Sequence, residues 1–400
     1  MSRALKACSF HPFRVSCEGG GTGRSFVMRC FLPFLTVFFL SLASLAAEEY
    51  HVFFGTYTKG TDSEGIYRAT FNSETGALSD PELAVEVSNP SFLAIHPEGR
   101  ALYAASEVAD FEGGGAVMAY AIAEDGSLTL IDSQASGGSG PCHLSIDQRG
   151  KVMAVANYGG GSVSSYEVGD PAAFPPAAST IQHVGSSIHP KRQQNPHAHS
   201  INFSPDGRFA YAADLGADKI FIYAVDPGSG RMTAAGEFAM EPGDGPRHFA
   251  FHPGGEFAYV INEMTLTVTA FSVEPDTGML TAMQTISTLP EGAEAEGSTA
   301  EVVCHPGGKF LYGSNRGHDS IAVYQIDGET GKLTAVEHEP IQGKTPRNFA
   351  LDPTGKWLLA AGQNSDTVAV FSVNQDNGEL DYTGRRIEVV KPVCVRFLKK

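Results

Sequence analysis

The chain has 400 residues, with 45 glycines, 23 prolines and a formal net charge of −17 at pH 7. A chain this acidic is poorly suited to the phosphate backbone of nucleic acids, so we expect no nucleic-acid partner. The abundance of glycine and proline favours short strands joined by turns over long helices.

We interpret residues 1–47 as a secretory signal peptide. Residues 31–47 are uncharged and largely apolar, Arg29 precedes them, and Ser44-Leu45-Ala46 is a small-x-small cleavage pattern. Met28 is a plausible true start, because it would leave a compact charged region before the apolar run. The alternative is a transmembrane anchor, although the run is shorter than the ~20 residues that a spanning helix needs. The expectation is a secreted or periplasmic protein with no stable membrane span after cleavage.

One turn then recurs six times along residues 48–400, at steps of 47 to 57 residues. An apolar run precedes each turn and another follows it. The turns are His96-Pro97-Glu98-Gly99, Asp147-Gln148-Arg149-Gly150, Ser204-Pro205-Asp206-Gly207, His252-Pro253-Gly254-Gly255, His305-Pro306-Gly307-Gly308 and Asp352-Pro353-Thr354-Gly355. A period of this length indicates a repeat architecture.

Each repeat contains four predicted strands. In one repeat the turn at 252–255 is followed by an aromatic and aliphatic strand at 257–261, then by another at 268–273. A second turn at 277–278 leads into a more variable fourth strand. Four short antiparallel strands in ~50 residues form a β-propeller blade.

The ends of the repeat region predict how many blades there are. Residues 52–57 match a second strand and residues 65–71 a third, but no first strand precedes them. At the other end, residues 392–398 resemble a first strand such as 246–251. We therefore predict one all-β domain over 48–400, a seven-bladed β-propeller with a composite closing blade made of its N- and C-terminal strands. Such closure removes exposed sheet edges.

Function is expected where equivalent positions of the repeats carry unlike polar residues. The starts of the first strands and the ends of the second strands share one rim near the axis. On the first strands two successive positions hold Ser91, Cys142, His199, Arg247, Ala300 and Arg347, then Phe92, His143, Ser200, His248, Glu301 and Asn348. The second strands end in Glu107, Tyr158, Glu263, Arg316 and Gln363, with Asn157, Asp214, Asn262 and Asn315 beside them. A ring of His, Arg and Glu suits an anionic, oxygen-rich small molecule.

Other polar residues have simpler interpretations. His96, His252 and His305 occupy a turn position that Asp147, Ser204 and Asp352 fill elsewhere, so we expect all of them to accept a local turn hydrogen bond. His197 and His199 alternate on one strand and could form a metal pair, but no third ligand has a clear spacing. We therefore predict no metal and no other cofactor.

Two further features complete the pattern. Cys142, Cys304 and Cys394 remain after signal cleavage, and their wide spacing is not that of a disulfide framework, so we expect core thiols. Residues 169–198 form the one long insertion, which includes Lys191-Arg192 and should cap the mouth of the axial channel.

The chain resembles the family of seven-bladed propeller lactonases, which includes bacterial 6-phosphogluconolactonases of the propeller type and fungal carboxy-muconate cyclases. The resemblance covers essentially residues 50–398. It is carried by Gly140-Pro-Cys-His143, Ala156-Asn-Tyr-Gly-Gly-Gly-Ser162, Asn195-Pro-His-Ala-His-Ser200, Asp214-Leu-Gly-Ala-Asp-Lys219, Gly245-Pro-Arg-His248, Asn262-Glu263, Ser314-Asn-Arg-Gly317 and Thr345-Pro-Arg-Asn348. The resemblance implies that His199, Arg247, Glu263 and Arg316 are catalytic, and the comparison of repeat positions includes the same residues without ranking them.

The expected reaction is metal-independent hydrolysis of a sugar-acid lactone, and the resemblance makes 6-phosphogluconolactone the best named substrate. Either Glu263 or His199 would deprotonate the attacking water. Arg247 and Arg316 would bind the substrate anion and stabilise the oxyanion. The further candidates for substrate binding are His143 and Asn157, which would orient sugar hydroxyls, together with His197, Asp214, Asn262 and Arg347.

Two alternatives remain open from the sequence. The first is a cyclase that forms a lactone from a muconate-like diacid, with the same arginine pair on the two carboxylates. The second is a propeller without enzymatic activity that binds a protein or glycan at the cell surface. The predicted export argues against a cytoplasmic metabolite such as 6-phosphogluconolactone, though not against lactone chemistry. The sequence does not specify an oligomeric state.

Overall fold

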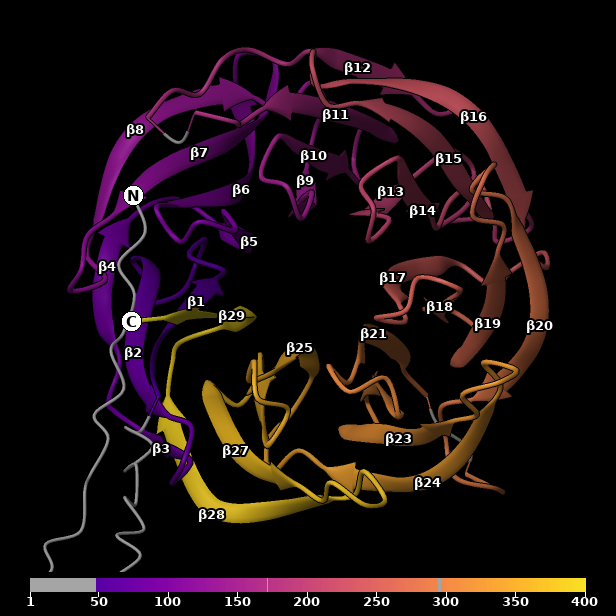
Figure 1. Cartoon of the computed structure of the whole chain (residues 1–400). Coiled ribbons are helices and arrows are strands. Elements are labelled where there is room, and N and C mark those ends of the chain that lie inside the picture. The colour runs from indigo at the N-terminus through magenta and orange to yellow at the C-terminus, as the bar shows by residue number, and fades with distance from the viewer. Residues whose placement is uncertain (1–47, 171, 294–295) are drawn as a thin grey trace, which may run out of the picture. The chain divides into compact units, whose positions relative to one another are not determined.

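The computed structural model describes residues 48–170, 172–293 and 296–400, so the predicted signal peptide lies outside the described residues. The described residues form seven antiparallel sheets, or blades, around a central axis, as Figure 1 shows. The innermost strands of neighbouring blades contact one another around the whole ring. The prediction of an all-β, seven-bladed propeller is confirmed. Within the described part of the chain, no helix is long and apolar enough to cross a membrane.

The strands follow one another blade by blade. Blade 1 contains β1 (Glu49–Thr56), β2 (Gly65–Asn72), β3 (Ala77–Leu78), β4 (Glu82–Glu86) and β29 (Pro392–Lys399). Blade 2 contains β5 (Pro90–Ile95), β6 (Ala101–Phe111), β7 (Gly114–Ile122) and β8 (Leu128–Ala135). Blade 3 contains β9 (Pro141–Ile146), β10 (Val152–Asn157), β11 (Ser162–Glu167) and β12 (Ser179–Gln182).

The remaining four blades repeat the same order from the axis outward. Blade 4 contains β13 (Ala198–Phe203), β14 (Phe209–Asp214), β15 (Lys219–Asp226) and β16 (Arg231–Ala239). Blade 5 contains β17 (Pro246–Phe251), β18 (Phe257–Asn262), β19 (Thr267–Val273) and β20 (Leu280–Ser287). Blade 6 contains β21 (Ser298–Cys304), β22 (Phe310–Arg316), β23 (Ser320–Ile326) and β24 (Leu333–Pro340). Blade 7 contains β25 (Pro346–Leu351), β26 (Trp357–Gly362), β27 (Thr367–Val373) and β28 (Leu380–Glu388).

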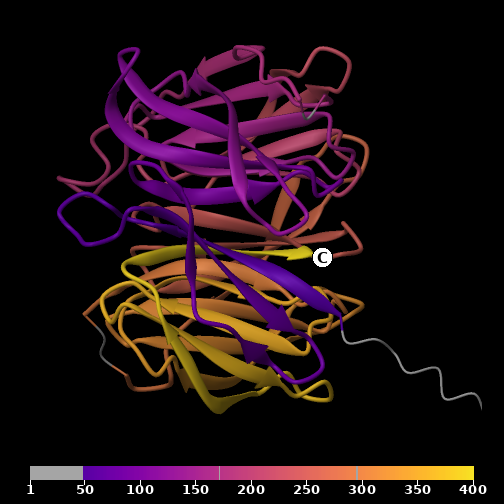
Figure 2. The same cartoon turned by 90° about the vertical axis from the view of Figure 1, so that its left-hand side faces the viewer.

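Blade 1 is closed by strands from both ends of the propeller. Strand β1 pairs antiparallel with β2 on one side, where Phe53 lies opposite Arg68, and with β29 on the other, where Phe53 lies opposite Arg396. In Figure 2 the yellow β29 runs beside the indigo strands of the first blade. The predicted composite blade is therefore confirmed, and β29 supplies the innermost strand that the N-terminal segment lacks.

The hydrophobic core is divided among the spaces between neighbouring blades. Phe54 and Val395 of blade 1, for example, pack in one cluster with Leu359 and Val370 of blade 7, and all four side chains are fully buried. This arrangement explains the apolar runs on both sides of each turn. Each blade packs against a neighbouring blade on both faces, so its inner strands are buried on both sides. Truncating such a phenylalanine to alanine typically costs about 3–5 kcal/mol.

Three turn histidines each link their own blade to the next one. His252 Nδ1 accepts a hydrogen bond from the Gly254 amide at 3.0 Å, and Nε2 lies 3.0 Å from the carbonyl oxygen of Gly308 in the following turn. Gly308 has a φ of +72°, and a Cβ there would lie 2.6 Å from His252 Nε2, so only glycine fits. His96 and His305 make the same two contacts. The predicted turn bond is confirmed, and the structure adds the bond between blades.

Candidate active site

The candidate site lies at the opposite rim, where the innermost strands begin. His199 lies on β13 and Arg247 on β17, both close to the axis, whereas Glu263 directly follows β18 and Arg316 ends β22. The antiparallel pairing of β17 with β18 brings the start of one strand to the end of the other, with Pro246 opposite Asn262. The side chains that the sequence comparison placed on one rim thus come from three consecutive blades.

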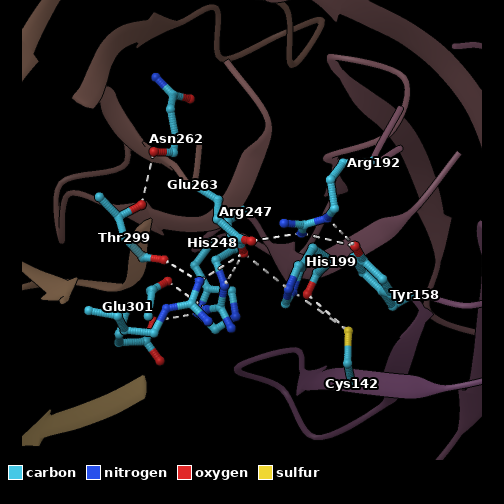
Figure 3. A network of polar contacts seen from close by, with 12 residues as sticks. Cys142, Tyr158, Arg192, His199, Arg247, His248, Asn262, Glu263, Thr299 and Glu301 are labelled. Atoms are coloured by element: carbon cyan, nitrogen blue, oxygen red, sulfur yellow. Dashed lines mark hydrogen bonds and ion pairs between the residues drawn. The ribbon is translucent and has the colours of Figure 1, made fainter. Parts of the chain in front are cut away.

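Glu263 is the centre of this group (Figure 3). Its Oε2 lies 3.0 Å from Arg247 Nε, 3.1 Å from Arg316 Nη2 and 3.7 Å from His199 Nε2. Its Oε1 accepts a hydrogen bond from Arg192 Nη2 at 2.7 Å. One buried carboxylate therefore forms ion pairs with three guanidinium groups. The four catalytic residues predicted from the sequence, His199, Arg247, Glu263 and Arg316, lie together.

This arrangement fixes the charge of the carboxylate. Burial alone raises the pKa of Glu263, but Arg316, Arg247 and Arg192 outweigh it and lower the pKa to about 2. Burial and the neighbouring Arg247 lower the pKa of Arg316 to about 9, which still leaves it charged at neutral pH. Glu263 is therefore ionised under all ordinary conditions, and three guanidinium groups engage its two oxygens.

His199 has a different environment. Burial, followed by the charge of Arg247, holds its pKa well below the ordinary value of 6.5, so the imidazole is neutral at pH 7. Cys142 Sγ lies 3.7 Å from its Nδ1 and donates a hydrogen bond to its carbonyl oxygen at 3.4 Å. The sulfur can accept a hydrogen from Nδ1, and in that tautomer the free lone pair of the ring is on Nε2.

A cavity of about 290 Å³ opens beside these side chains. Its lining residues are Glu107, Cys142, Tyr158, Arg192, His199, Glu263, Arg316 and Arg347. Arg347 lies over the ring of Tyr57, 5.4 Å from its centre. No carboxylate among the described residues forms an ion pair with Arg347, whereas the other three arginines of the site share Glu263. Three guanidinium groups and the carboxylates of Glu107 and Glu263 line the cavity. Arg247 does not line it but pairs with Glu263, which brings the formal excess at the site to two positive charges.

Arg192 was not among the site residues predicted from the sequence. It belongs to residues 183–197, here termed the arm, which connect β12 to β13. Besides Glu263, Arg192 contacts the hydroxyl of Tyr158 at 3.0 Å, and about 40% of its side chain is exposed. The predicted insertion at 169–198 also contains β12, so only its last part reaches the cavity.

Five predicted substrate-binding residues do not line the cavity: His143, Asn157, His197, Asp214 and Asn262. Asn157 is fully buried, and its Nδ2 donates to the carbonyl oxygen of Ser136 and to the hydroxyl of Ser162. Asn262 is buried in the same way, and its amide points away from the Glu263 carboxylate in Figure 3. Both asparagines thus bind neighbouring strands and loops of the propeller.

Asp214 anchors the arm. Its Oδ1 accepts hydrogen bonds from the backbone amides of His197, Gly216 and Ala217, and its Oδ2 lies 2.6 Å from His183 Nδ1. The other nitrogen of His183 lies 2.7 Å from the hydroxyl of Tyr223. This buried chain of contacts fixes the backbone just before His199.

The two remaining histidines support the site from its sides. The ring of His197 stacks on that of Tyr158, with centres 4.6 Å apart, and its Nδ1 lies 2.8 Å from the Tyr158 carbonyl oxygen. His143 packs against Phe92, with ring centres 4.1 Å apart. In the part of the chain that the structure describes, no three His, Cys, Asp or Glu side chains are grouped to hold a metal ion.

The sequence matches the family model described as "Lactonase, 7-bladed beta-propeller" over residues 51–397. A 6-phosphogluconolactonase of Bacillus subtilis is 36% identical over 351 residues, which cover 88% of this chain and 99% of that protein. A 6-phosphogluconolactonase of Formosa agariphila is 34% identical and covers 75% of this chain and 86% of its own length. Among solved structures, the periplasmic gluconolactonase PpgL of Pseudomonas aeruginosa superposes with a TM-score of 0.82 at 32% identity, covering 88% of this chain and 99% of that one.

Proposed function

Because this chain belongs to the family of seven-bladed β-propeller lactonases and is itself a 6-phosphogluconolactonase-like lactonase, we propose that it hydrolyses an anionic sugar-acid lactone. The observation that carries this proposal is the positive charge of the cavity in a protein whose formal net charge is −17. A concave site with converging guanidinium groups suits an anionic ligand. The best single candidate is 6-phosphogluconolactone, the substrate that the names of two relatives give for those proteins.

His199 is the proposed general base. Its Nε2 is 3.7 Å from Glu263 Oε2, too far for a direct hydrogen bond, and the contact of Nδ1 with Cys142 leaves the Nε2 lone pair free for water. When Nε2 takes a proton from the attacking water, the neighbouring Glu263 carboxylate stabilises the imidazolium that forms. General-base catalysis of this kind contributes typically ~10²–10⁴-fold.

Arg316 is the proposed oxyanion donor. Its Nη2 donates to the Thr299 carbonyl oxygen at 2.7 Å and also contacts Glu263, so the orientation of the guanidinium is fixed. Its buried Nε has no hydrogen-bond partner among the described residues. A buried donor without a partner is costly, and a substrate oxygen that gains negative charge in the transition state would satisfy it. Arg192 and Arg347 are left to bind the anionic group of the substrate.

The test is a screen for lactone hydrolysis that follows proton release at a pH where spontaneous ring opening is slow. The substrates are 6-phosphogluconolactone, its unphosphorylated counterpart gluconolactone, and a neutral aliphatic lactone. We expect a kcat/KM for the phosphorylated lactone that exceeds the value for gluconolactone. Equal values would contradict recognition of the phosphate group. Hydrolysis of gluconolactone alone would mean that the substrate is an unphosphorylated sugar lactone.

We further propose that the protein is exported. The apolar run at 31–47 supports this proposal, and the related propeller PpgL is a periplasmic gluconolactonase. Sequencing the N-terminus of the protein purified from its native host tests the proposal. A mature start between Ala46 and Tyr50 is expected, and protein that retains residues 31–45 would contradict cleavage.

A further inference from the structure

A second, much smaller cavity lies beside the first. Its volume is about 10 Å³, which is of the order that a single water-sized occupant needs. Its lining residues are Ser91, Phe92, Cys142, Arg247, His248, Arg347 and Val393. Cys142 and Arg347 line both cavities, so the two are neighbours, and the small one is bordered by the innermost strands of blades 1, 2, 3, 5 and 7.

Several buried polar atoms around this small cavity have no hydrogen-bond partner among the described residues. Ser91 Oγ and His248 Nε2 are two of them, and their residues are only 4% and 3% exposed. Arg247 uses Nε for Glu263 and Nη1 for the Ala300 carbonyl oxygen, and its Nη2 pairs with no described residue. Buried polar groups are rarely left without partners, because each one costs about 1–3 kcal/mol.

The chemistry of the lining selects the kind of occupant. None of the side chains that line the cavity is a carboxylate, and two of them are guanidinium groups. Arg347 in particular has no carboxylate partner among the described residues. A water molecule must donate as well as accept, whereas an anion only accepts and also offsets the charge of Arg347. We propose that this cavity is a binding site for a small monovalent anion of the size of chloride, held by Arg347, Arg247 and Ser91.

His248 can complete the donor set. Its Nδ1 lies 2.7 Å from Glu301 Oε1, and the other oxygen of Glu301 accepts a hydrogen bond from Asn348. Burial raises the pKa of Glu301, which favours its protonated form. A protonated Glu301 donates to Nδ1, and the hydrogen of the neutral ring is then on Nε2, where it can donate to the anion.

The anion site goes beyond the proposed reaction, although the two share Arg347. Arg347 lines both cavities, whereas Arg247 lines only the small one and is linked to the larger site through its ion pair with Glu263. A larger anion such as phosphate does not fit in about 10 Å³ but does fit in about 290 Å³. Chloride and phosphate are therefore expected to occupy different cavities, so that blocking the small cavity leaves phosphate a place to bind.

Crystals grown without halide and then soaked in bromide give the direct test. We expect an anomalous difference peak between Arg347, Arg247 and Ser91. Bromide only on surface arginines, with a water or no density in the small cavity, would mean an adventitious ion only and would overturn the proposal.

Thermal unfolding in solution gives a second test at constant ionic strength, with sodium chloride replaced stepwise by sodium isethionate, whose anion is too large for the cavity. We expect chloride to raise Tm by about 2 °C or more once its concentration is far above Kd. Ser91→Val adds methyl groups to the cavity and should abolish the chloride effect, while stabilisation by inorganic phosphate should persist. Ser91→Ala, which only removes the hydroxyl, serves if the valine variant does not fold, and it should weaken chloride binding.

Ser200→Ala is the matched control. Ser200 is also buried, and its hydroxyl likewise has no partner in the part of the chain that the structure describes, but it does not line the small cavity. Chloride should therefore stabilise this variant as much as the unmodified protein. A chloride effect that Ser91→Val leaves intact, or no chloride effect in the unmodified protein, would contradict the proposed site.

Discussion

The two rims of the propeller use the same residue type for opposite purposes. At the rim of the turns, His96, His252 and His305 repeat one pair of backbone contacts, and each ring joins its turn to the next. At the other rim His199 has no equivalent, since its position holds Ser91, Cys142, Arg247, Ala300 and Arg347 in other blades. A contact repeated in several blades stabilises the ring, whereas a position that differs from blade to blade can carry a residue for binding or catalysis.

The largest effect is expected from removing β29, the strand that closes the ring and on which both rims depend. Deleting residues 392–400 removes β29, which pairs with β1 and packs Val395 against blade 7. The exposed edge of β1 and the opened core should prevent stable folding and cause aggregation. Size-exclusion chromatography and thermal unfolding check this. A monomeric truncated protein with an unchanged Tm would refute the importance of the composite blade.

The same substitution on the two rims should separate catalysis from stability. His199→Ala should lower kcat by about 10²–10⁴-fold with the fold retained, because it removes the proposed base. His252→Ala is the matched control, and its kcat should stay near that of the unmodified protein. Steady-state kinetics with the best lactone of the screen give both values. A His199→Ala variant with nearly full activity would end the proposed role of the imidazole.

Glu263 links the site to acid stability. Since its pKa in the folded protein is about 2 against an ordinary value of 4.5, it stabilises the fold above pH 4.5, and this contribution is lost as the pH falls towards 2. Between pH 5 and pH 3 the loss should be about 2 kcal/mol. Glu263→Gln should be less stable at pH 7 and should lack this part of the acid destabilisation. Urea unfolding in phosphate-free buffer measures both, and parallel pH curves for the two proteins would contradict the pKa.

The smallest effect is expected from a single turn histidine. His252→Ala should lower the free energy of unfolding by about 1–2 kcal/mol, because it removes the turn contact and the bond to Gly308. His252→Asp should recover only the turn contact, as Asp352 does when it accepts from the Thr354 amide. An aspartate variant as unstable as the alanine variant would show that the bond between blades dominates.

The fold could be predicted from the sequence because its period is a local signal that occurs many times. The six turns, their glycines and the apolar runs beside them repeat the same physical requirement, so each occurrence strengthens the interpretation of the others. The site residues His199, Arg247, Glu263 and Arg316 could be found by the same comparison, as exceptions to the repeat. Their grouping around one carboxylate depends on side-chain geometry, which the spacing does not contain.

The comparison of repeat positions fails for two residues. Arg192 comes from the arm, which has no counterpart in the other blades, so no repeat position points to it. The sequence predicts substrate binding by Asn157 because it is a polar residue on the rim. Asn315, however, makes the same structural contacts as Asn157, with Nδ2 bonded to the Thr288 carbonyl oxygen and the Ser320 hydroxyl. The recurrence of Asn or Asp at this position was itself the sign of a structural role, and it could have been recognised from the sequence.

The composite blade also determines when this protein can fold during its synthesis. Strand β1 is among the first parts of the propeller to leave the ribosome, and its partner β29 is the last strand of the ring. Phe53 can therefore pair with Arg396 only after nearly the whole chain has been made. Blades 2 to 7 can form sheets from consecutive strands as they are translated, because each uses only its own segment of chain. The ring itself closes only after translation has passed β29, which makes closure a late step that depends on a contact between distant parts of the chain.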